Sequence, residues 1–405
     1  MQFCSGIFIV RVLSQSEYGL FTYSQNIIAF FTLLNGFGIL NGLLQYGVKS
    51  ETQAKKNEYI KYSIKIAIFS SLIQIILILF YFLFGDFISP DAKHIFLSMI
   101  FMPFVSLIIE FIQIKNRLDL DNKSMAKFSN LNTFTNLVGM VSGGYLFGVL
   151  GVVIGKYIGN LISIYLYSHH IIYIFKIWNK VSDINKREQK EINKFSIVSM
   201  VNNSISQLLY LLDVFLIGLI LVDDILIAQY KTATLLPIAL NFIPLSLMIY
   251  VYPYFARNSE NKTWIYNNYK KMVLLFGSFN LCISLFMVIF SKIIVLILFG
   301  NEYLEIIPIF QVLAIGYFFA GTFRIPGGNI LASIGEVKYN LYTTIVSGIL
   351  NVILSIILIN LYGSIGAALA TVIIFIVSGL ISNIIIIKKL KPRKLNYKQN
   401  KYIEI

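Results

Sequence analysis

The chain has 405 residues, of which 57% are hydrophobic and 13% charged, and its mean hydropathy is +0.76. Soluble domains carry about 25% charged residues, so this composition excludes an ordinary soluble fold. The net charge of +14 lies mainly in short connections between apolar runs, which argues against a nucleic-acid partner and for a membrane topology signal. Only two cysteines are present, and no metal-binding or phosphate-binding motif appears, so we expect no cofactor.

Apolar runs long enough to cross a bilayer recur along the whole chain. Such runs must be helical, because lipid offers the backbone no hydrogen-bond partner. The sequence therefore predicts an all-α polytopic membrane protein with about twelve transmembrane helices. We expect them at 1–10, 18–46, 62–85, 94–114, 126–147, 150–175, 195–220, 225–256, 270–297, 304–331, 338–361 and 363–387.

Alternate connections between these helices differ in charge. Even-numbered connections and the tail are rich in Lys and Arg, whereas odd-numbered ones carry Asp and Glu, such as Asp86, Asp91, Asp223 and Asp224. Because positive connections stay in the cytoplasm, we expect a multi-pass membrane protein with both termini cytoplasmic.

The first segment, 1–10, supplies only about 15 Å of helix, half of a bilayer. We therefore expect a truncated first helix that lacks its cytoplasmic half. Arg11 follows it and is expected to reach the outer interface with its long side chain.

A motif recurs at an offset of 215 residues, about half the chain. In each copy an Asn precedes a Gly-x-x-Gly turn by twelve residues, as Asn136 with Gly148 and Gly151, and Asn351 with Gly363 and Gly366. The repeat predicts two pseudo-symmetric six-helix bundles, as in many transporters. We assign the motif itself to structure, namely to a tight turn between two closely packed helices.

The hydrophilic stretch 176–194 separates the two predicted bundles. The expected domains are an N-terminal bundle (1–175, helix one incomplete), a cytoplasmic linker (176–194), a C-terminal bundle (195–388) and a basic cytoplasmic tail (389–405).

Polar residues recur at helical spacing on the predicted seventh helix, where they share one face. Lipid contact would be costly for such a face, so we expect it to line a wet cavity. The candidate cavity residues are, from helix two, Gln25, Asn26 and Asn35; from helix seven, Asn203, Ser206, Gln207, Tyr210 and Asp213; and from helix eight, Lys231 and Asn241. Pro237 and Pro244 are expected to kink helix eight.

Charged side chains inside the predicted transmembrane helices have two interpretations, a structural ion pair or a functional site. A centred Asp, Lys or Arg costs about 2.5–3.5 kcal/mol on insertion scales, so it requires a partner or water. Asp213 and Lys231 would form either a structural ion pair or a substrate or coupling site. Glu110 and Arg324 lie near corresponding positions of the two halves, and we predict that they pair at an inner gate.

Several motifs resemble those of the O-antigen and capsule repeat-unit flippases (Wzx type), relatives of the multidrug-and-toxin-extrusion transporters. They are Arg11-Val12-Leu13-x4-Tyr18-Gly19-Leu20-Phe21, Gly36-Phe37-Gly38-x2-Asn41-Gly42, Leu212-Asp213-Val214-Phe215-Leu216-Ile217-Gly218, Tyr230-Lys231-Thr232-Ala233-Thr234-Leu235-Leu236-Pro237, Phe299-Gly300-x2-Tyr303 and Asn329-Ile330-Leu331-x3-Gly335-x2-Lys338. Each is loose, but their order and spacing extend over nearly the whole chain.

The resemblance implies a central cavity lined by helices one, two, seven and eight. It implies a polyprenyl-diphosphate-linked oligosaccharide as substrate, moved to the outer leaflet by alternating access, with Lys231 as a partner for the diphosphate. Membrane lipids, a polysaccharide polymerase and chain-length proteins are the expected partners. Membrane voltage and cation coupling through Asp213 remain alternative driving forces.

Other classes remain open as alternatives. A cation-coupled small-molecule or multidrug exporter of the same fold is the first. A lipid II flippase is expected to have fourteen helices, and a major-facilitator transporter to have a Gly-x3-Asp-Arg-x-Gly loop that 47–61 lacks. A membrane glycosyltransferase, polymerase or ligase would need a large outer loop with catalytic acids. We therefore expect a protein that is not an enzyme.

Overall fold

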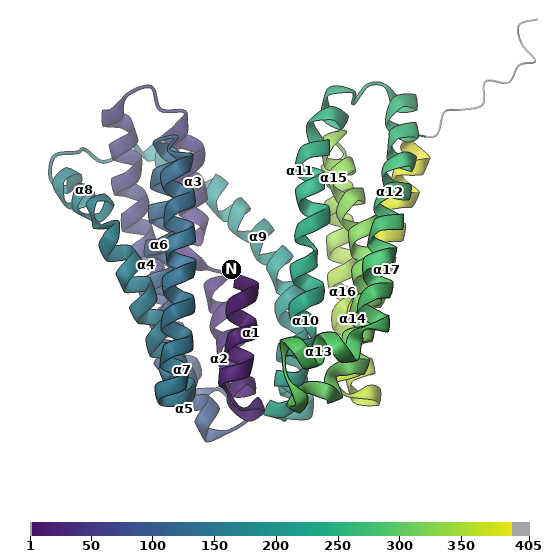
Figure 1. The fold of residues 1–405 in the computed structure, drawn as a ribbon. Coiled ribbons are helices and arrows are strands. Elements are labelled where there is room, and N and C mark those ends of the chain that lie inside the picture. The colour runs from purple at the N-terminus through teal and green to yellow at the C-terminus, as the bar shows by residue number, and fades with distance from the viewer. Residues whose placement is uncertain (1, 391–405) are drawn as a thin grey trace, which may run out of the picture. The chain divides into compact units, whose positions relative to one another are not determined.

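The described chain is built from helices and contains no strand (Figure 1). The structure is a computed structural model that describes residues 2–390, apart from the side chains at 2, 202, 206, 209, 210 and 337. The predicted basic tail from 391 onward lies outside the described residues. The all-α prediction is confirmed.

The helices follow one another with short connections. Up to the middle of the chain they are α1 (Gln2–Val12), α2 (Gln15–Thr32), η1 (Asn35–Gly38), α3 (Ile39–Val48), α4 (Gln53–Phe84), α5 (Pro90–Ser98), α6 (Met102–Leu118), α7 (Asn122–Leu166), α8 (Ser168–Trp178), α9 (Lys186–Leu221) and α10 (Asp224–Leu240). The rest are α11 (Phe242–Arg257), α12 (Lys262–Ile289), α13 (Ser291–Leu298), η2 (Asn301–Ile306), α14 (Ile307–Phe319), η3 (Ala320–Arg324), α15 (Ile325–Ser333), α16 (Val337–Tyr362) and α17 (Ser364–Leu390).

Within residues 2–390, nine helical segments are long and apolar enough to cross a membrane. One of them, Asn122–Leu166, is a hairpin of two predicted helices that turns at Phe147 and Gly148. Two shorter apolar helices, Phe3–Val12 and Leu211–Leu221, lie at the first and seventh predicted positions. Together they account for the twelve helices that the sequence predicted.

The chain divides into two compact units, and the predicted division into two bundles, a linker and a tail stays a prediction. The first unit holds the chain up to Leu235 together with Val295–Ile307 and Ser355–Ala367. The second holds Leu236–Ile294, Pro308–Leu354 and the chain from Ala368. Each unit is described by itself below.

Each unit has its own apolar core. In the first unit Ile39, Ile60 and Ile112 join α3, α4 and α6 and are fully buried. In the second unit Ile265 and Ile330, on α12 and α15, are buried in the same way. Many large apolar side chains elsewhere point outward, as expected of helices that face lipid rather than water.

Several predicted helices are interrupted. The predicted helix 18–46 breaks at η1, where Gly36, Phe37 and Gly38 all have positive φ angles of 57°, 48° and 70°. The carbonyl oxygen of Leu33 at this break accepts a hydrogen bond from Ser204 Oγ at 2.9 Å. Helix eight is divided at Asn241 between Pro237 and Pro244, as the two prolines predicted.

The α7 hairpin is held at very short range by glycines. A Cβ atom on Gly155 would lie 1.9 Å from the carbonyl oxygen of Gly139, and one on Gly151 would lie 1.9 Å from that of Gly143. The turn residue Gly148 has a φ of 57°, and its counterpart in the repeat, Gly363, has a φ of 61°. The predicted role of the repeated motif, a tight turn between closely packed helices, is therefore confirmed.

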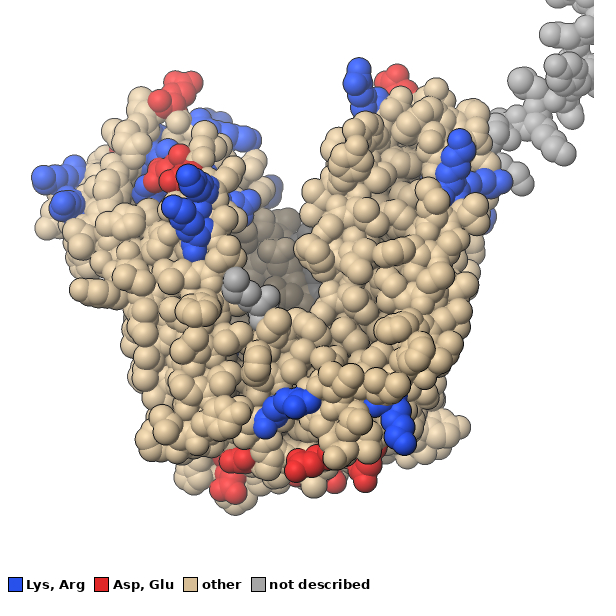
Figure 2. Space-filling view, in the orientation of Figure 1, with Lys and Arg blue, Asp and Glu red and all other residues tan. Residues whose placement is uncertain are grey.

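Charge is distributed unevenly over the first unit. Figure 2 shows Lys and Arg predominating at the end that holds the α3–α4 connection, which we call the basic end, and Asp and Glu gathered at the opposite end. The separation agrees with the alternating charge of the connections. That the basic end faces the cytoplasm stays a prediction.

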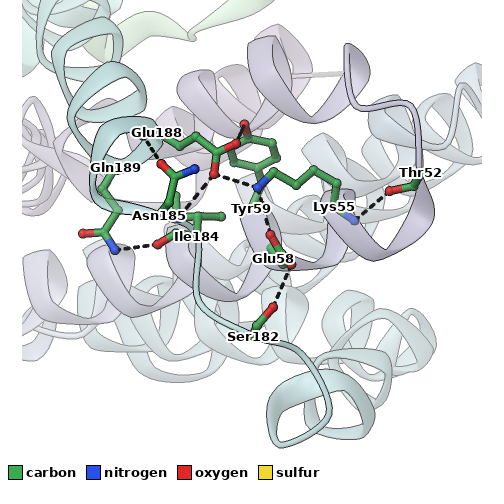
Figure 3. A network of polar contacts seen from close by, with 9 residues as sticks. All are labelled: Thr52, Lys55, Glu58, Tyr59, Ser182, Ile184, Asn185, Glu188 and Gln189. Carbon is green, nitrogen blue, oxygen red and sulfur yellow. Dashed lines mark hydrogen bonds and ion pairs between the residues drawn. The ribbon is translucent and has the colours of Figure 1, made fainter.

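The predicted linker is largely helical and folded onto the basic end (Figure 3). Only 179–185 separates α8 from α9. Lys55 on α4 contacts Glu188 at 2.6 Å and Glu58 at 3.0 Å, and Ser182 donates a hydrogen bond to Glu58 at 2.7 Å. A capping box of Asn185 and Glu188 starts α9. The hydrophilic residues of this stretch are thus used to dock it against α4.

Candidate functional site

A polar cavity of ≈ 510 Å³ lies inside the first unit, a size typical of ligand pockets. It is lined from α1, α2, α6, α7 and α10. Its polar uncharged lining residues are Ser5, Tyr18, Thr22, Gln25, Ser106, Gln113, Asn132, Thr133, Asn136 and Asn160. The small residues Ser5 and Gly6 of α1 leave the room for it.

Three charged side chains line the same cavity: Glu110 from α6, Lys156 from α7 and Lys231 from α10. At neutral pH their ordinary charges give the cavity one positive charge in excess. Desolvated charges of this kind attract ligands of opposite sign more strongly than charges in water do. The arrangement suits an anionic, hydrogen-bonding ligand.

A cluster of side-chain amides forms one wall of the cavity. The Nδ2 group of Asn132 donates hydrogen bonds to Asn160 Oδ1 at 3.0 Å and to Ser163 Oγ at 2.7 Å, and Asn136 donates to Asn160 Oδ1 at 2.6 Å. Asn136 Oδ1 is buried and receives no hydrogen bond from the described residues. A buried acceptor left open in this way favours a polar ligand or water.

Sequence reasoning missed Lys156. The signal was available, because this lysine interrupts the predicted sixth helix between apolar residues, and a charge inside a span is a functional-site hypothesis. Asn136 was assigned to structure alone, but it also lines the cavity through its place on α7.

Of the predicted cavity residues, the structure brings Gln25 and Lys231 together in this cavity. Asn26, which follows Gln25 in the sequence, is buried. Its Nδ2 donates a hydrogen bond to the carbonyl oxygen of Leu211 at 3.2 Å. Asp213 is buried and accepts a hydrogen bond from Tyr230 Oη at 2.7 Å. Its carboxylate is therefore held between α9 and α10.

The other predicted residues lie elsewhere. Asn203 lines a separate pocket near the basic end, with Ser199, Lys49 and Arg117. Gln207 is exposed. The side chains of Ser206 and Tyr210 lie outside the described residues.

Asn35 and Asn241 mark the two helix breaks described above, Asn35 in the first unit and Asn241 in the second. Each has a buried Oδ1 that receives no hydrogen bond from the described residues. Their role as cavity residues stays a prediction.

The two members of the predicted gate pair belong to different units. Glu110 lines the cavity of the first unit, whereas Arg324 stacks its guanidinium over the Phe375 ring of the second unit at 4.9 Å. The gate pair stays a prediction.

A family model described as "Polysaccharide biosynthesis protein" matches residues 8–308. Among curated proteins, an uncharacterized membrane protein of Methanocaldococcus jannaschii is 37% identical over 90 residues, 22% of this chain. The match spans only 18% of that protein's length.

Solved structures show the same fold. The lipid II flippase MurJ in an inward closed conformation matches with a TM-score of 0.74 and 16% identity, over 96% of this chain and 86% of MurJ. An inward-facing multidrug resistance MATE family transporter matches with a TM-score of 0.71 and 14% identity, over 96% and 93%. A transporter of the same superfamily from Pyrococcus furiosus matches with a TM-score of 0.64 and 14% identity, over 96% and 91%.

The family match covers most of the chain, and the fold matches extend over nearly all of it. The chain belongs to the polysaccharide biosynthesis protein family, and it has the fold of the lipid II flippase and of the MATE family transporter that it matches.

Proposed function

We propose that the protein is a flippase for polyprenyl-diphosphate-linked oligosaccharide repeat units. It moves them from the cytoplasmic to the outer leaflet of a bacterial inner membrane by alternating access, for surface polysaccharide biosynthesis. No bond is made or broken, so the protein is not an enzyme. A polysaccharide polymerase and chain-length proteins would use the product.

The observation that carries this proposal is the cavity with two lysines, one carboxylate and a wall of amides. Lys156 and Lys231 would offset part of the diphosphate charge, because a bare diphosphate is costly to place in hydrocarbon. Gln25 and the Asn136–Asn160 cluster would bind sugar hydroxyls through side-chain amides. The apolar polyprenyl chain would stay in lipid, where it needs no cavity.

The second pocket near the basic end supports the same direction of transport. Lys49 and Arg117 line it together with Asn203 and other polar residues. Basic groups near the surface raise the local concentration of an anionic head group. If the basic end faces the cytoplasm, as the sequence predicts, the head group meets positive charge first there and again in the cavity.

Membrane voltage is the driving force that we propose in this scheme. An inside-negative potential favours outward movement of an anion by about 2.3 kcal/mol per charge per 100 mV. Cation coupling through Asp213 is the alternative, and the Tyr230–Asp213 hydrogen bond already supplies that carboxylate with a partner.

The same fold also hosts multidrug exporters, and Glu110 is the one carboxylate of the cavity that would attract an organic cation. The two lysines beside it oppose such binding. Expression in a flippase-deficient strain separates the two functions. We expect surface polysaccharide to be restored without a gain in drug resistance, and the reverse result would establish the exporter.

A transport assay then tests the mechanism. In proteoliposomes with a labelled polyprenyl-diphosphate oligosaccharide, flipping should follow an imposed voltage and ignore sodium and proton gradients. Lys156→Met and Lys231→Met should each abolish flipping. Lys190→Met, an exposed lysine of α9, is the matched control and should leave it unchanged.

A further inference from the structure

An apolar groove of ≈ 400 Å³ lies on the first unit between α3, α4, α6 and α8. Apart from Asn179 at one end, its lining is hydrophobic throughout. The residues that matter here are Ile64 and Ile68 of α4, Leu107 and Phe111 of α6, and Ile174 and Trp178 of α8.

The groove is separate from the substrate cavity, and α6 lies between them. Ser106, Glu110 and Gln113 point from α6 into the cavity, whereas Leu107 and Phe111 line the groove. The helix therefore has one polar and one apolar face, each with its own cavity. A ligand in the groove would not occupy the candidate transport site.

The sequence of α4 places the groove at the edge of the hydrocarbon layer. Between 66 and 84 this helix carries no charge, and at about 1.5 Å per residue that stretch spans the roughly 30 Å of a bilayer core. Lys65 therefore marks the boundary, and Ile68 lies one turn inside it. Trp178 lines the groove from α8, and tryptophan is enriched at this interface.

Two lysines continue the groove face of α4 toward the basic end. Lys61 precedes Ile64 by three residues and Lys65 precedes Ile68 by three, so they share its side of the helix. Both contact the carboxylate of Asp183: Lys61 Nζ is 3.3 Å from Oδ1, and Lys65 Nζ is 2.9 Å from Oδ1 and 3.1 Å from Oδ2. Two ammonium groups on one carboxylate leave one positive charge in excess.

We propose that this groove binds one acyl chain of an anionic phospholipid, with the lipid phosphate held by Lys61 and Lys65. A phosphodiester carries one negative charge and matches the excess positive charge of the two lysines. Its chain enters an apolar groove at the depth where hydrocarbon begins. In the absence of lipid Asp183 contacts both ammonium groups, and Lys61 Nζ also donates a hydrogen bond to the carbonyl oxygen of Val181 at 2.6 Å, so both acceptors compete with the phosphate.

The two tryptophans of the chain, Trp178 and Trp264, supply a direct test. In the Trp264→Phe protein, Trp178 is the sole tryptophan, and its fluorescence is quenched by a lipid whose acyl chain carries bromine. We expect stronger quenching in vesicles with brominated phosphatidylglycerol than with brominated phosphatidylcholine at equal mole fraction. In the matched Trp178→Phe protein, Trp264 should report no such lipid preference from the groove.

Charge variants identify the head-group site. Lys61→Ala with Lys65→Ala should remove the preference for phosphatidylglycerol, since each basic residue near a membrane surface is worth about a fivefold change in binding. Asp183→Asn should raise the preference, because it removes the competing carboxylate. If the lysines and Asp183 acted only to dock the linker, both variants would change quenching in the same direction.

Three results would overturn the proposal. Equal quenching by both brominated lipids would mean that the groove holds bulk lipid without head-group recognition. Absence of quenching would mean that hydrocarbon does not enter it. Relief of quenching by a small amount of unlabelled polyprenyl diphosphate would show that the substrate chain, rather than a phospholipid, is the occupant.

Discussion

The guanidinium group of Arg11 donates a hydrogen bond from Nε to the carbonyl oxygen of Leu298, at 2.8 Å. The same group also reaches the carbonyl oxygens of Leu296, at 3.4 Å, and Ile297. These are the last carbonyls of α13, which carry the negative end of its dipole; that of Leu296 also accepts a hydrogen bond from the Gly300 amide at 3.1 Å. Arg11 thus joins α1 to a helix nearly three hundred residues away in sequence.

Removing the contact of Arg11 with α13 should make the backbone at the end of α13 less protected from exchange. In Arg11→Ala the carbonyls of α13 lose a charged donor, and hydrogen bonds to charged groups are worth about 1.5–3 kcal/mol. We expect amide hydrogen exchange in Leu298–Glu302 to become about tenfold faster or more. Mass spectrometry of the exchanged peptides measures it.

Arg187→Ala is the control for that experiment, because Arg187 is an exposed residue of α9 that contacts Glu191 within its own helix. It should leave exchange in Leu298–Glu302 unchanged. Unchanged exchange in Arg11→Ala itself would mean that the contacts of α13 do not depend on Arg11.

Lys156 should be required for recognition of the anionic head group rather than for folding. In Lys156→Met the cavity loses one of its two positive charges while the side chain keeps a similar length. We expect binding of a polyprenyl-diphosphate oligosaccharide to weaken by at least tenfold, as measured by titration in detergent. The midpoint of thermal unfolding should shift little, because replacing a desolvated charge with an apolar side chain of similar size is often neutral or stabilising.

The companion variant Glu110→Gln tests whether the net charge of the cavity determines the affinity for the anionic ligand. It leaves both lysines and removes the one negative charge of the cavity, so binding of the same anionic ligand should become tighter. Weaker binding in Glu110→Gln would contradict a simple charge match and would assign Glu110 a direct contact with the ligand.

Sequence reasoning found the helices because their signal is strong and local. Long apolar runs between charged connections define all twelve predicted positions. The breaks were harder to predict: at η1 the three positive φ angles of Gly36, Phe37 and Gly38 depend on α9, since a Cβ atom on Gly38 would lie 2.4 Å from the carbonyl oxygen of Ser196. Such tertiary constraints leave no periodic pattern in the sequence.

The candidate site was found only in part. Gln25 and Lys231 were identified as polar residues in apolar segments and do share a cavity. Lys156 and the three asparagines Asn132, Asn136 and Asn160 come together only when α7 folds back on itself. Helical periodicity describes one helix at a time, so a site formed by two arms of a hairpin is not visible in it.

Close approach of the two arms of α7 should make its glycines intolerant of any side chain. In Gly155→Ala the added Cβ would lie 1.9 Å from the Gly139 carbonyl oxygen, so the arms must separate. Overpacking of this kind costs about 1–3 kcal/mol. We expect a thermal unfolding midpoint several degrees lower in detergent.

The matched control is Gly277→Ala on α12. There an added Cβ atom would lie 3.4 Å from Thr322 Cγ2, so the variant should be neutral or slightly stabilising. Equal midpoints for the two variants would refute the packing argument.

Acid should release the linker from α4. Hydrogen bonds from Lys65 and then Lys61 lower the pKa of Asp183 from its ordinary value of 3.8. A carboxyl group with a lowered pKa stabilises the folded contact fully above its ordinary pKa, and this stabilisation is lost as pH falls through the lowered value. The contact should therefore be constant from neutral pH down to about pH 5 and disappear well below pH 4.

Comparison of the wild-type protein with Asp183→Asn isolates this effect from that of Glu58 and Glu188, which also dock the linker. The measurement is amide hydrogen exchange in 179–185, corrected for the intrinsic effect of pH. At pH 7 the variant should exchange faster than the wild type, and the difference should vanish at low pH, where Asp183 is protonated. A difference that persisted undiminished in acid would show that the Asp183 charge is not what holds the linker.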